Sequence, residues 1–212
     1  MYLQGGLPII LNTFMIRMVV FAILWGNYLL SADTLSVDKN SAQIRWIGKK
    51  VTGEHDGSID ISSGWVIIDN NTIINGNIIL DMKTITSLDI ESPEYRKKLD
   101  DHLKNEDFFH VDSFPFSRLK FSENQSFIIS DTTVNIFSAE LTIRGITHKI
   151  HFPGLVSNTG DSYHTKGELN IDRTLFDVRY GSGKFFDDLG DRMIYDEFTI
   201  QFDMHLTKSE KN

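Results

Sequence analysis

The pattern of hydrophobic and polar residues after position 33 is dominated by a period of two. In residues 51–61 the odd positions are mostly apolar or small, and the even positions are polar or charged. Residues 163–171 and 194–206 alternate in the same way, with aliphatic and aromatic side chains on one side. Such alternation is typical of β-strands that bury one face and expose the other. The chain is therefore predicted to consist mainly of long, half-buried strands.

Further strands are expected between these segments. They are placed at about residues 35–48, 64–70, 75–86, 116–122, 132–144 and 147–157. Turn-forming residues separate several of them, at Ser62–Ser63–Gly64, at Asn70–Asn71 and at Asn75–Gly76. The pattern predicts eight or nine strands.

One helix is predicted, at residues 93–104. Ser92 is a natural N-cap, and Pro93 fits the first helical position. Tyr95, Leu99 and Leu103 recur four residues apart, so this face is expected to pack on the strands. The side chains expected to remain in water are Arg96, Lys97 and Asp100.

Strands this numerous, without an internal repeat or a regular alternation with helices, leave two architectures, a β-sandwich and a closed β-barrel. An eight-stranded antiparallel barrel has an interior that is filled by side chains or holds one small ligand. The inward positions mix large residues, such as Trp46 and Phe202, with small ones, such as Gly57 and Gly167. This mixture leaves room inside the barrel, although small residues also let strands coil at barrel corners.

Residues 1–32 are predicted to be a secretion signal. Arg17 supplies a short positive region, the apolar run begins at Met18, and small residues precede Asp33. Met15 is a better start than Met1, and cleavage near Ala32 leaves a barrel domain of residues 33–212. A retained signal anchor is the alternative. It is disfavoured because the apolar run is well short of the ~20 residues that a membrane span requires.

The amino-acid composition limits the possible binding partners of the protein and its cellular compartment. The net charge of the chain is −8, and Arg17 is the one charged residue among the first thirty-two, so the predicted mature domain carries −9. An acidic surface repels phosphate backbones, so nucleic acid is not an expected partner. There is no cysteine, which excludes disulfides and thiolate metal sites. Together with an export signal, this suits a bacterial periplasmic or secreted protein.

Side chains capable of chemistry form no recognised catalytic or metal-binding pattern. His148 and His151 are three apart in a predicted strand, so they point to opposite faces and cannot share a metal ion. Residues 181–184 lack the spacing of a phosphate-binding loop, and the acidic residues of 187–197 lack the spacing of a calcium loop. Residues 179–192 are predicted to be a long solvated loop. These observations favour binding over catalysis, and no metal or cofactor is expected.

Several segments resemble the YceI-like family of polyisoprenoid-binding periplasmic proteins. The segments are Trp46-x-Gly48 with Gly53-x-His55-x-Gly57-x-Ile59, then His102-Leu103-Lys104-x-x-Asp107-Phe108-Phe109-x-Val111 with Phe114-Pro115, then Leu141-Thr142-Ile143-Arg144-Gly145-Ile146-Thr147-His148, and Ile171-Asp172-Arg173-Thr174-x-Phe176. The resemblance implies a lipocalin-like eight-stranded barrel with one helix packed on it and a hydrophobic tunnel. Residues 180–196 resemble one branch of the family rather than its isoprenoid-binding type member. The resemblance therefore implies only a ligand class: isoprenoids, quinones, fatty acids or fatty amides.

The inward faces and the resemblance together predict a non-catalytic protein that carries or sequesters a long apolar molecule. The expected ligand-binding residues are Ile44, Trp46, Ile59, Phe121, Phe137, Ala139, Leu141, Ile143, Leu169, Ile171, Phe198, Ile200 and Phe202. For the polar end of the ligand the candidates are Lys50, Arg144 and Arg173. Each apolar residue would serve equally well in an ordinary packed core.

Two other functions are weighed against this hypothesis. An enzyme acting on a lipid-like substrate in the same pocket is the main alternative. An outer-membrane barrel would need apolar residues facing outward, and the predicted helix and the polar C-terminal tail argue against it. No stable membrane span is expected, and the sequence leaves open whether the protein is a monomer or a homodimer.

Overall fold

The computed structural model describes residues 32–122, 125–129 and 132–208. The predicted secretion signal, apart from Ala32, and the residues after Lys208 lie outside the described residues. Within them the chain forms ten strands, one α-helix and two 3₁₀ turns. In chain order these are β1 (Asp33–Val37), β2 (Gln43–Lys50), β3 (Gly53–Asp69), β4 (Thr72–Ser87), α1 (Pro93–Lys104), β5 (Phe116–Phe121), β6 (Gln125–Ile129), β7 (Thr132–Ile143), β8 (Ile146–Asn158), β9 (Ser162–Asp172), η1 (Arg173–Phe176), η2 (Gly190–Arg192) and β10 (Ile194–Lys208).

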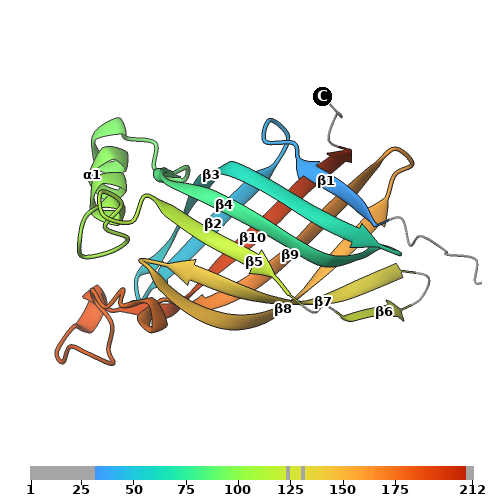
Figure 1. Ribbon diagram of the computed structural model, residues 1–212. Helices are drawn as coiled ribbons and strands as arrows, with labels where there is room; N and C mark the ends of the chain where they lie inside the picture. The colour runs from blue at the N-terminus through green and yellow to red at the C-terminus, as the bar shows by residue number, and fades with distance from the viewer. Residues whose placement is uncertain (1–31, 123–124, 130–131, 209–212) are drawn as a thin grey trace, which may run out of the picture.

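Eight of the described strands close into an antiparallel barrel (Figure 1). The order around the barrel is β2-β3-β4-β5-β7-β8-β9-β10, and β10 pairs back onto β2. Two short strands extend this ring. β1 pairs with β10 and β3, which are the neighbours of β2, and β6 pairs with β7, which is the neighbour of β5. The predicted eight-stranded, lipocalin-like barrel is confirmed.

The predicted turns are right in one place and wrong in two. Asn70 and Asn71 both have positive φ, 46° and 60°, and form the tight turn between β3 and β4. At Ser62–Ser63–Gly64 the chain does not turn. Instead the pairing register shifts, so these residues form a bulge that bends one continuous strand, β3. Asn75–Gly76 lies inside β4, where pairing with β3 and β5 on both sides overrides the local turn preference.

The predicted strand at 35–48 is divided into β1 and β2. Asp38 causes the interruption, because its carboxylate accepts hydrogen bonds from the Asn40 N–H at 3.0 Å and from the Ser41 hydroxyl at 2.8 Å. Such side-chain bonds offer the backbone a turn in place of the strand ladder. Strand β6 was not predicted.

Helix α1 has the predicted bounds and lies at the left end of the barrel in Figure 1. Its contacts are only partly as predicted. Leu103 is buried and Leu99 is partly buried, but Tyr95 is 65% exposed. Asp100 is not solvated as expected, because its carboxylate accepts hydrogen bonds from Thr86 Oγ1 and from both the N–H and the hydroxyl of Ser87. The helix therefore meets β4 through its last two turns. In its first turn Arg96, which was expected to remain in water, is partly buried and its guanidinium donates two hydrogen bonds to the Ile90 carbonyl, at 2.7 and 3.0 Å.

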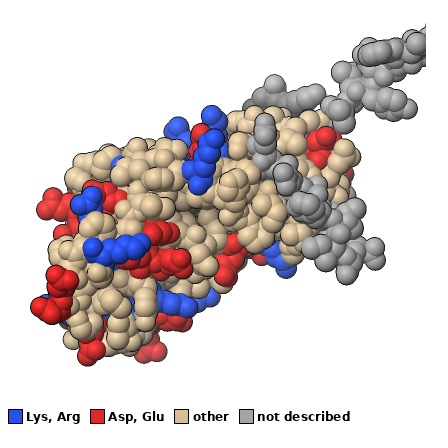
Figure 2. Space-filling view, turned by 90° about the horizontal axis from the view of Figure 1, so that it is seen from below, with Lys and Arg blue, Asp and Glu red and all other residues tan. Residues whose placement is uncertain are grey.

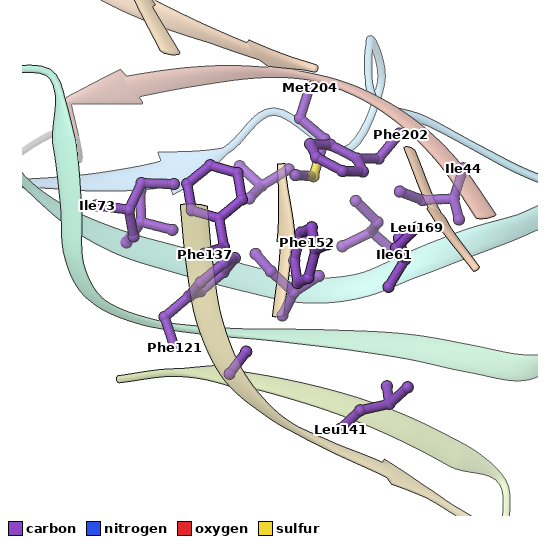
Figure 3. Close-up of a cluster of buried hydrophobic side chains, with 14 of the residues drawn as sticks. Ile44, Ile61, Ile73, Phe121, Phe137, Leu141, Phe152, Leu169, Phe202 and Met204 are labelled. Carbon is purple, nitrogen blue, oxygen red and sulfur yellow. The ribbon is translucent and has the colours of Figure 1, made fainter. Parts of the chain in front are cut away.

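The inward residues of all the barrel strands form the core, part of which is shown in Figure 3. A second cluster lies under α1 and is built from Trp46, Ile85, Leu103, Phe108 and neighbouring apolar side chains. On the outer face shown in Figure 2, Lys and Arg side chains lie among Asp and Glu and form no continuous basic patch. Most buried residues are thus apolar and face the barrel interior, whereas the charged side chains of this face lie scattered on the outside.

Candidate functional site

A cavity of about 90 Å³ lies inside the barrel. The strands reach it with alternate residues, as the period of two requires. Of the described residues that line it, only Ser117 and Arg118 are polar. The lining is Ile44, Ile59, Ile78, Leu80, Met82, Phe109, Ser117, Arg118, Leu119, Phe121, Leu141, Ile143, Phe152, Leu169, Ile171, Phe198, Ile200, Phe202 and Met204. A cavity with so few polar partners cannot hold ordered water well and suits an apolar occupant.

A second cavity, of about 70 Å³, lies between the first one and helix α1. It is lined by Trp46, Gly48, Ile59, Ile85, Leu103, Phe108, Phe109, Arg173, Ile194, Tyr195, Glu197 and Phe198. Ile59, Phe109 and Phe198 line both cavities, so they stand where the two meet. The rings of Phe109 and Phe198 are in edge-to-face contact, with centroids 6.4 Å apart. The two rings therefore form part of the boundary between the cavities.

The barrel interior beyond the first cavity is closed by aromatic rings. Phe137 is 1% exposed and its ring contacts Phe121, Phe152 and Phe202, with centroids 5.3 to 6.5 Å apart (Figure 3). A Cβ at Gly167 would lie 2.6 Å from the Phe202 ring. The small inward residues were expected to leave room for a ligand. This expectation is wrong at Gly167, and also at Gly57 beside Trp46, because aromatic rings occupy the space above both glycines.

Most of the predicted ligand-binding residues lie around the cavities. Ten line the first cavity, namely Ile44, Ile59, Phe121, Leu141, Ile143, Leu169, Ile171, Phe198, Ile200 and Phe202. Trp46 and Arg173 line the second. Phe137 and Ala139 are buried in the packed core and line neither cavity. Lys50, which is exposed at the end of β2, and Arg144 also line neither.

Arg173 is 4% exposed, and hydrogen bonds to backbone carbonyls compensate for the loss of water around its charged guanidinium. Its guanidinium donates hydrogen bonds to the carbonyls of Tyr195, Val178 and Ile194 at 2.8 to 3.1 Å. An oxygen of Asp196 lies 3.7 Å from Nη2. Burial lowers the pKa of Arg173, and the carboxylate of Asp196 acts in the opposite direction. The guanidinium stays charged at any physiological pH, so it places a buried positive charge beside the second cavity.

The long loop after β9 is tied to the barrel by Lys184. Its ammonium lies 2.8 Å from an Asp172 oxygen and 3.4 Å from an Asp196 oxygen. Burial opposes ionisation of Asp172, but hydrogen bonds from Lys184 and Thr174 outweigh it and lower the pKa of Asp172. The bond to Asp172 raises the pKa of Lys184. The residues predicted as a solvated loop are thus anchored by this charged network, and also by Tyr180, whose ring contacts those of His102 and Phe108.

Arg144 has a structural position at the turn between β7 and β8. Its φ is 50°, and its guanidinium donates to the carbonyls of Phe108 and Asp177 at 2.7 and 3.0 Å. These bonds connect the β7–β8 turn to the segment after α1 and to the loop after β9. Arg144 therefore holds together the end of the barrel that carries the second cavity.

Several cavity residues were not predicted. Some have a signal in the sequence, because Ile78, Leu80 and Met82 alternate along β4, and Met204 has the same phase as Phe202. Phe109 has no signal in the periodicity, since it follows α1 in a segment with no regular period, although it stands in one of the segments that resemble the family. The other residues of the first cavity that were missed are Ser117, Arg118, Leu119 and Phe152, and those of the second cavity are Gly48, Ile85, Leu103, Phe108, Ile194, Tyr195 and Glu197.

No helix within residues 32–122, 125–129 and 132–208 is long and apolar enough to cross a bilayer.

A family model described as the YceI-like domain matches residues 35–206. No curated protein sequence matches the chain.

Among solved structures, the fold is similar to that of BcnA from Burkholderia cenocepacia, at 20% identity and a TM-score of 0.64, covering 80% of this chain and 98% of that one. A polyisoprenoid-binding domain from Saccharophagus degradans, implicated in plant cell wall breakdown, matches at 10% identity and a TM-score of 0.60, covering 84% and 99%. The Campylobacter jejuni YCEI protein matches at 12% identity and a TM-score of 0.52, covering 72% and 85%. At these identities the likeness shows a common fold.

Proposed function

The chain belongs to the YceI-like family, and we propose that it is a non-catalytic protein that holds one long apolar molecule in its barrel and carries or sequesters it. The observation that carries the proposal is the internal cavity, in which Ser117 and Arg118 are the only polar residues among the described lining. The similarity in fold to the polyisoprenoid-binding domain from Saccharophagus degradans supports the same class of ligand. The proposed ligands are isoprenoids, quinones, fatty acids and fatty amides.

Burial of hydrocarbon alone would provide the binding free energy. Each CH₂ removed from water contributes about 0.8 kcal/mol, so ten of them contribute about 8 kcal/mol. Association costs about 4 kcal/mol or more in lost freedom of motion. A short ligand would therefore bind weakly, and a chain long enough to bind tightly needs both cavities. Such a chain would pass between Phe109 and Phe198, which stand where the cavities meet.

The polar end of the ligand is proposed to lie at the second cavity. Of the three cations predicted for this role, Arg173 is the one that lines a cavity. Tyr195 and Glu197 line the same cavity and are exposed to solvent, so this cavity lies next to the outside. With its carboxylate, amide or quinone oxygen near Arg173, the ligand would extend its apolar chain into the first cavity.

The composition of the lining supports binding over turnover. General acid–base catalysis needs a titratable group within hydrogen-bond reach of the reacting atom. The described lining of the first cavity, where the apolar chain of the ligand is proposed to lie, offers one hydroxyl, on Ser117, and one guanidinium, on Arg118. The titratable residues of the second cavity, Tyr195 and Glu197, are exposed to solvent. We propose that the protein acts after export, in the periplasm or outside the cell, on the basis of the signal-like pattern in residues 1–32.

Mass spectrometry of the protein purified from its native envelope tests the proposal. We expect one apolar molecule per chain, and Ile143→Trp should reduce this load because the indole occupies the cavity. Ile74→Trp is the matched control, since Ile74 is 44% exposed on β4. An unliganded wild type, or equal lipid loads in the two variants, would contradict the proposal. Conversion of the bound molecule to a product of different mass would favour the enzyme.

A further inference from the structure

The register of β9 and β10 brings together two histidines and a carboxylate that are far apart in the sequence. His164 on β9 is the direct cross-strand partner of His205 on β10, and Asp203 lies two residues before His205 on the same side of β10. The ligand atoms of the three side chains all lie within 4.8 Å of one another. The inward residues Thr165 and Met204 alternate with them, so the three side chains are on the outside of the barrel, away from the apolar cavities.

We propose that His164, Asp203 and His205 form a binding site for a transition-metal ion of the Zn²⁺ class that bridges β9 and β10. Two imidazoles and one carboxylate suit Zn²⁺, Ni²⁺ and Cu²⁺, whereas Ca²⁺ and Mg²⁺ require mainly oxygen ligands. Three protein ligands on an exposed surface leave the remaining position to water, as in open zinc sites.

The three side chains need little rearrangement to bind a metal ion. His164 Nε2 lies 2.6 Å from Asp203 Oδ1, and a metal ion would replace the proton that these two atoms share. The imidazoles of His164 and His205 are stacked, with centroids 4.6 Å apart and planes 19° apart. Each ring must turn about its Cβ–Cγ bond to aim a nitrogen at one point, and this torsion has a broad energy minimum.

The surrounding charges are mixed. Asp38, in the turn between β1 and β2, donates its N–H to the His205 carbonyl at 2.9 Å, and its carboxylate adds negative charge near His205. Lys166 is the cross-strand partner of Asp203 and adds a positive charge on the same face. The ion would hold the end of β10, which is the strand that closes the barrel on β2.

Zinc binding to untagged, chelator-treated protein tests the site, because a histidine tag would itself bind the metal. By calorimetry at neutral pH we expect one Zn²⁺ per chain and no binding of Ca²⁺. His164→Gln and His205→Gln should each weaken binding about tenfold or more, since loss of an outer-shell partner alone costs 10- to 100-fold. At the same concentration, Zn²⁺ should also raise the Tm of the wild type clearly more than that of His205→Gln.

His151→Gln is the matched control. His151 is an exposed strand histidine on β8 whose Nδ1 lies 3.0 Å from the Ser138 hydroxyl, outside the cluster. This variant should bind Zn²⁺ as the wild type does. In the wild type, the imidazole resonances of His164 and His205 should shift on titration with Zn²⁺ while those of His151 do not. Equal zinc affinity in His205→Gln and the wild type would overturn the proposal, and so would uptake of Ca²⁺ with similar affinity. His205 is exposed, so this variant tests the site even if His164→Gln fails to fold.

Discussion

The two halves of the barrel interior differ in how they are filled. In the half near the β3–β4 turn, Leu35, Val66, Ile68, Ile73 and Phe137 are each at most 2% exposed. In the half near α1, inward residues such as Ile59, Leu80, Phe198 and Ile200 leave two cavities between them. Both halves are built from the same alternation along the same strands. The difference shows that an alternating pattern determines which side chains face inward but not whether they fill the interior.

The physical cause of the difference lies in where the aromatic rings point. Phe137 and Phe202 lie over Gly154 and Gly167, where a Cβ would come within 2.4 and 2.6 Å of their rings. The glycines on β8 and β9 therefore allow the rings to cross the barrel and meet. Near α1 the positions around the first cavity are mostly aliphatic, and branched side chains of this size do not reach across the barrel. One half is thus a packed core, and the other is suited to an apolar ligand.

The largest expected effect is the loss of Phe137. Phe137→Ala should lower the free energy of unfolding by about 3 to 5 kcal/mol, because it removes a buried ring and leaves a cavity. Phe198→Ala should cost clearly less, since Phe198 is only partly buried and already borders open space. Urea unfolding of both ligand-free variants measures the difference. Equal costs would mean that the two halves are packed alike.

The glycines of the packed half give the next largest effect. Gly167→Ala should destabilise the protein by about 2 to 3 kcal/mol, in the upper part of the range for overpacking. The new Cβ would meet the Phe202 ring at 2.6 Å and the Pro153 carbonyl at 2.8 Å, and the carbonyl belongs to a paired strand that cannot move aside. Gly48→Ala is the control, because its nearest neighbour would lie 3.9 Å away. A destabilised Gly48→Ala with a neutral Gly167→Ala would contradict the explanation.

The sequence predicted the barrel because its alternation is long and regular, but the local exceptions needed three-dimensional pairing. Ser62–Ser63–Gly64 has the composition of a turn and forms a bulge, because β3 has partners on both sides of that point. Tyr95 has the correct spacing for a packed helix face. It is exposed because α1 meets β4 only through its last two turns.

The lining of the two cavities was also predicted only in part, because the regular alternation along the strands reveals inward residues and irregular segments do not. Residues in phase with a strand, such as Ile44 and Leu169, were identified, whereas Phe109 lies in an irregular segment that periodicity cannot describe. The neighbourhood of His164 and His205 was missed entirely. It depends on the register between β9 and β10, which the intervening 21 residues, 173–193, do not reveal.

Filling the cavity should separate ligand binding from stability. Ile143→Phe adds volume where the first cavity has space, so the free energy of unfolding of the ligand-free protein should change by less than about 1.5 kcal/mol while the bound lipid is reduced. Ala139→Phe, on the same face of β7, should cost about 1 to 3 kcal/mol, because Ala139 is 2% exposed and lines neither cavity. Unfolding and lipid content measured side by side check both. A full lipid load in Ile143→Phe would place the ligand elsewhere.

The smallest expected effect concerns the charged anchor of the loop beside the second cavity. The pKa of Asp172 is lowered in the folded protein, so its ionised form favours folding. The resulting stabilisation is complete above the ordinary pKa of 3.8 and is lost as the pH falls below that value toward the folded pKa.

Asp172→Asn should therefore lower the Tm at pH 7. The decrease should be less than about 4 °C, because the Lys184 side chain is 53% exposed and the pair is screened by solvent. The Tm values of variant and wild type should approach each other as the pH falls below 3.8, and the difference at pH 7 should shrink in 1 M salt. Thermal unfolding from pH 7 to pH 3 checks the direction, and a difference that grows on acidification would show that Asp172 contributes through packing and not through its charge.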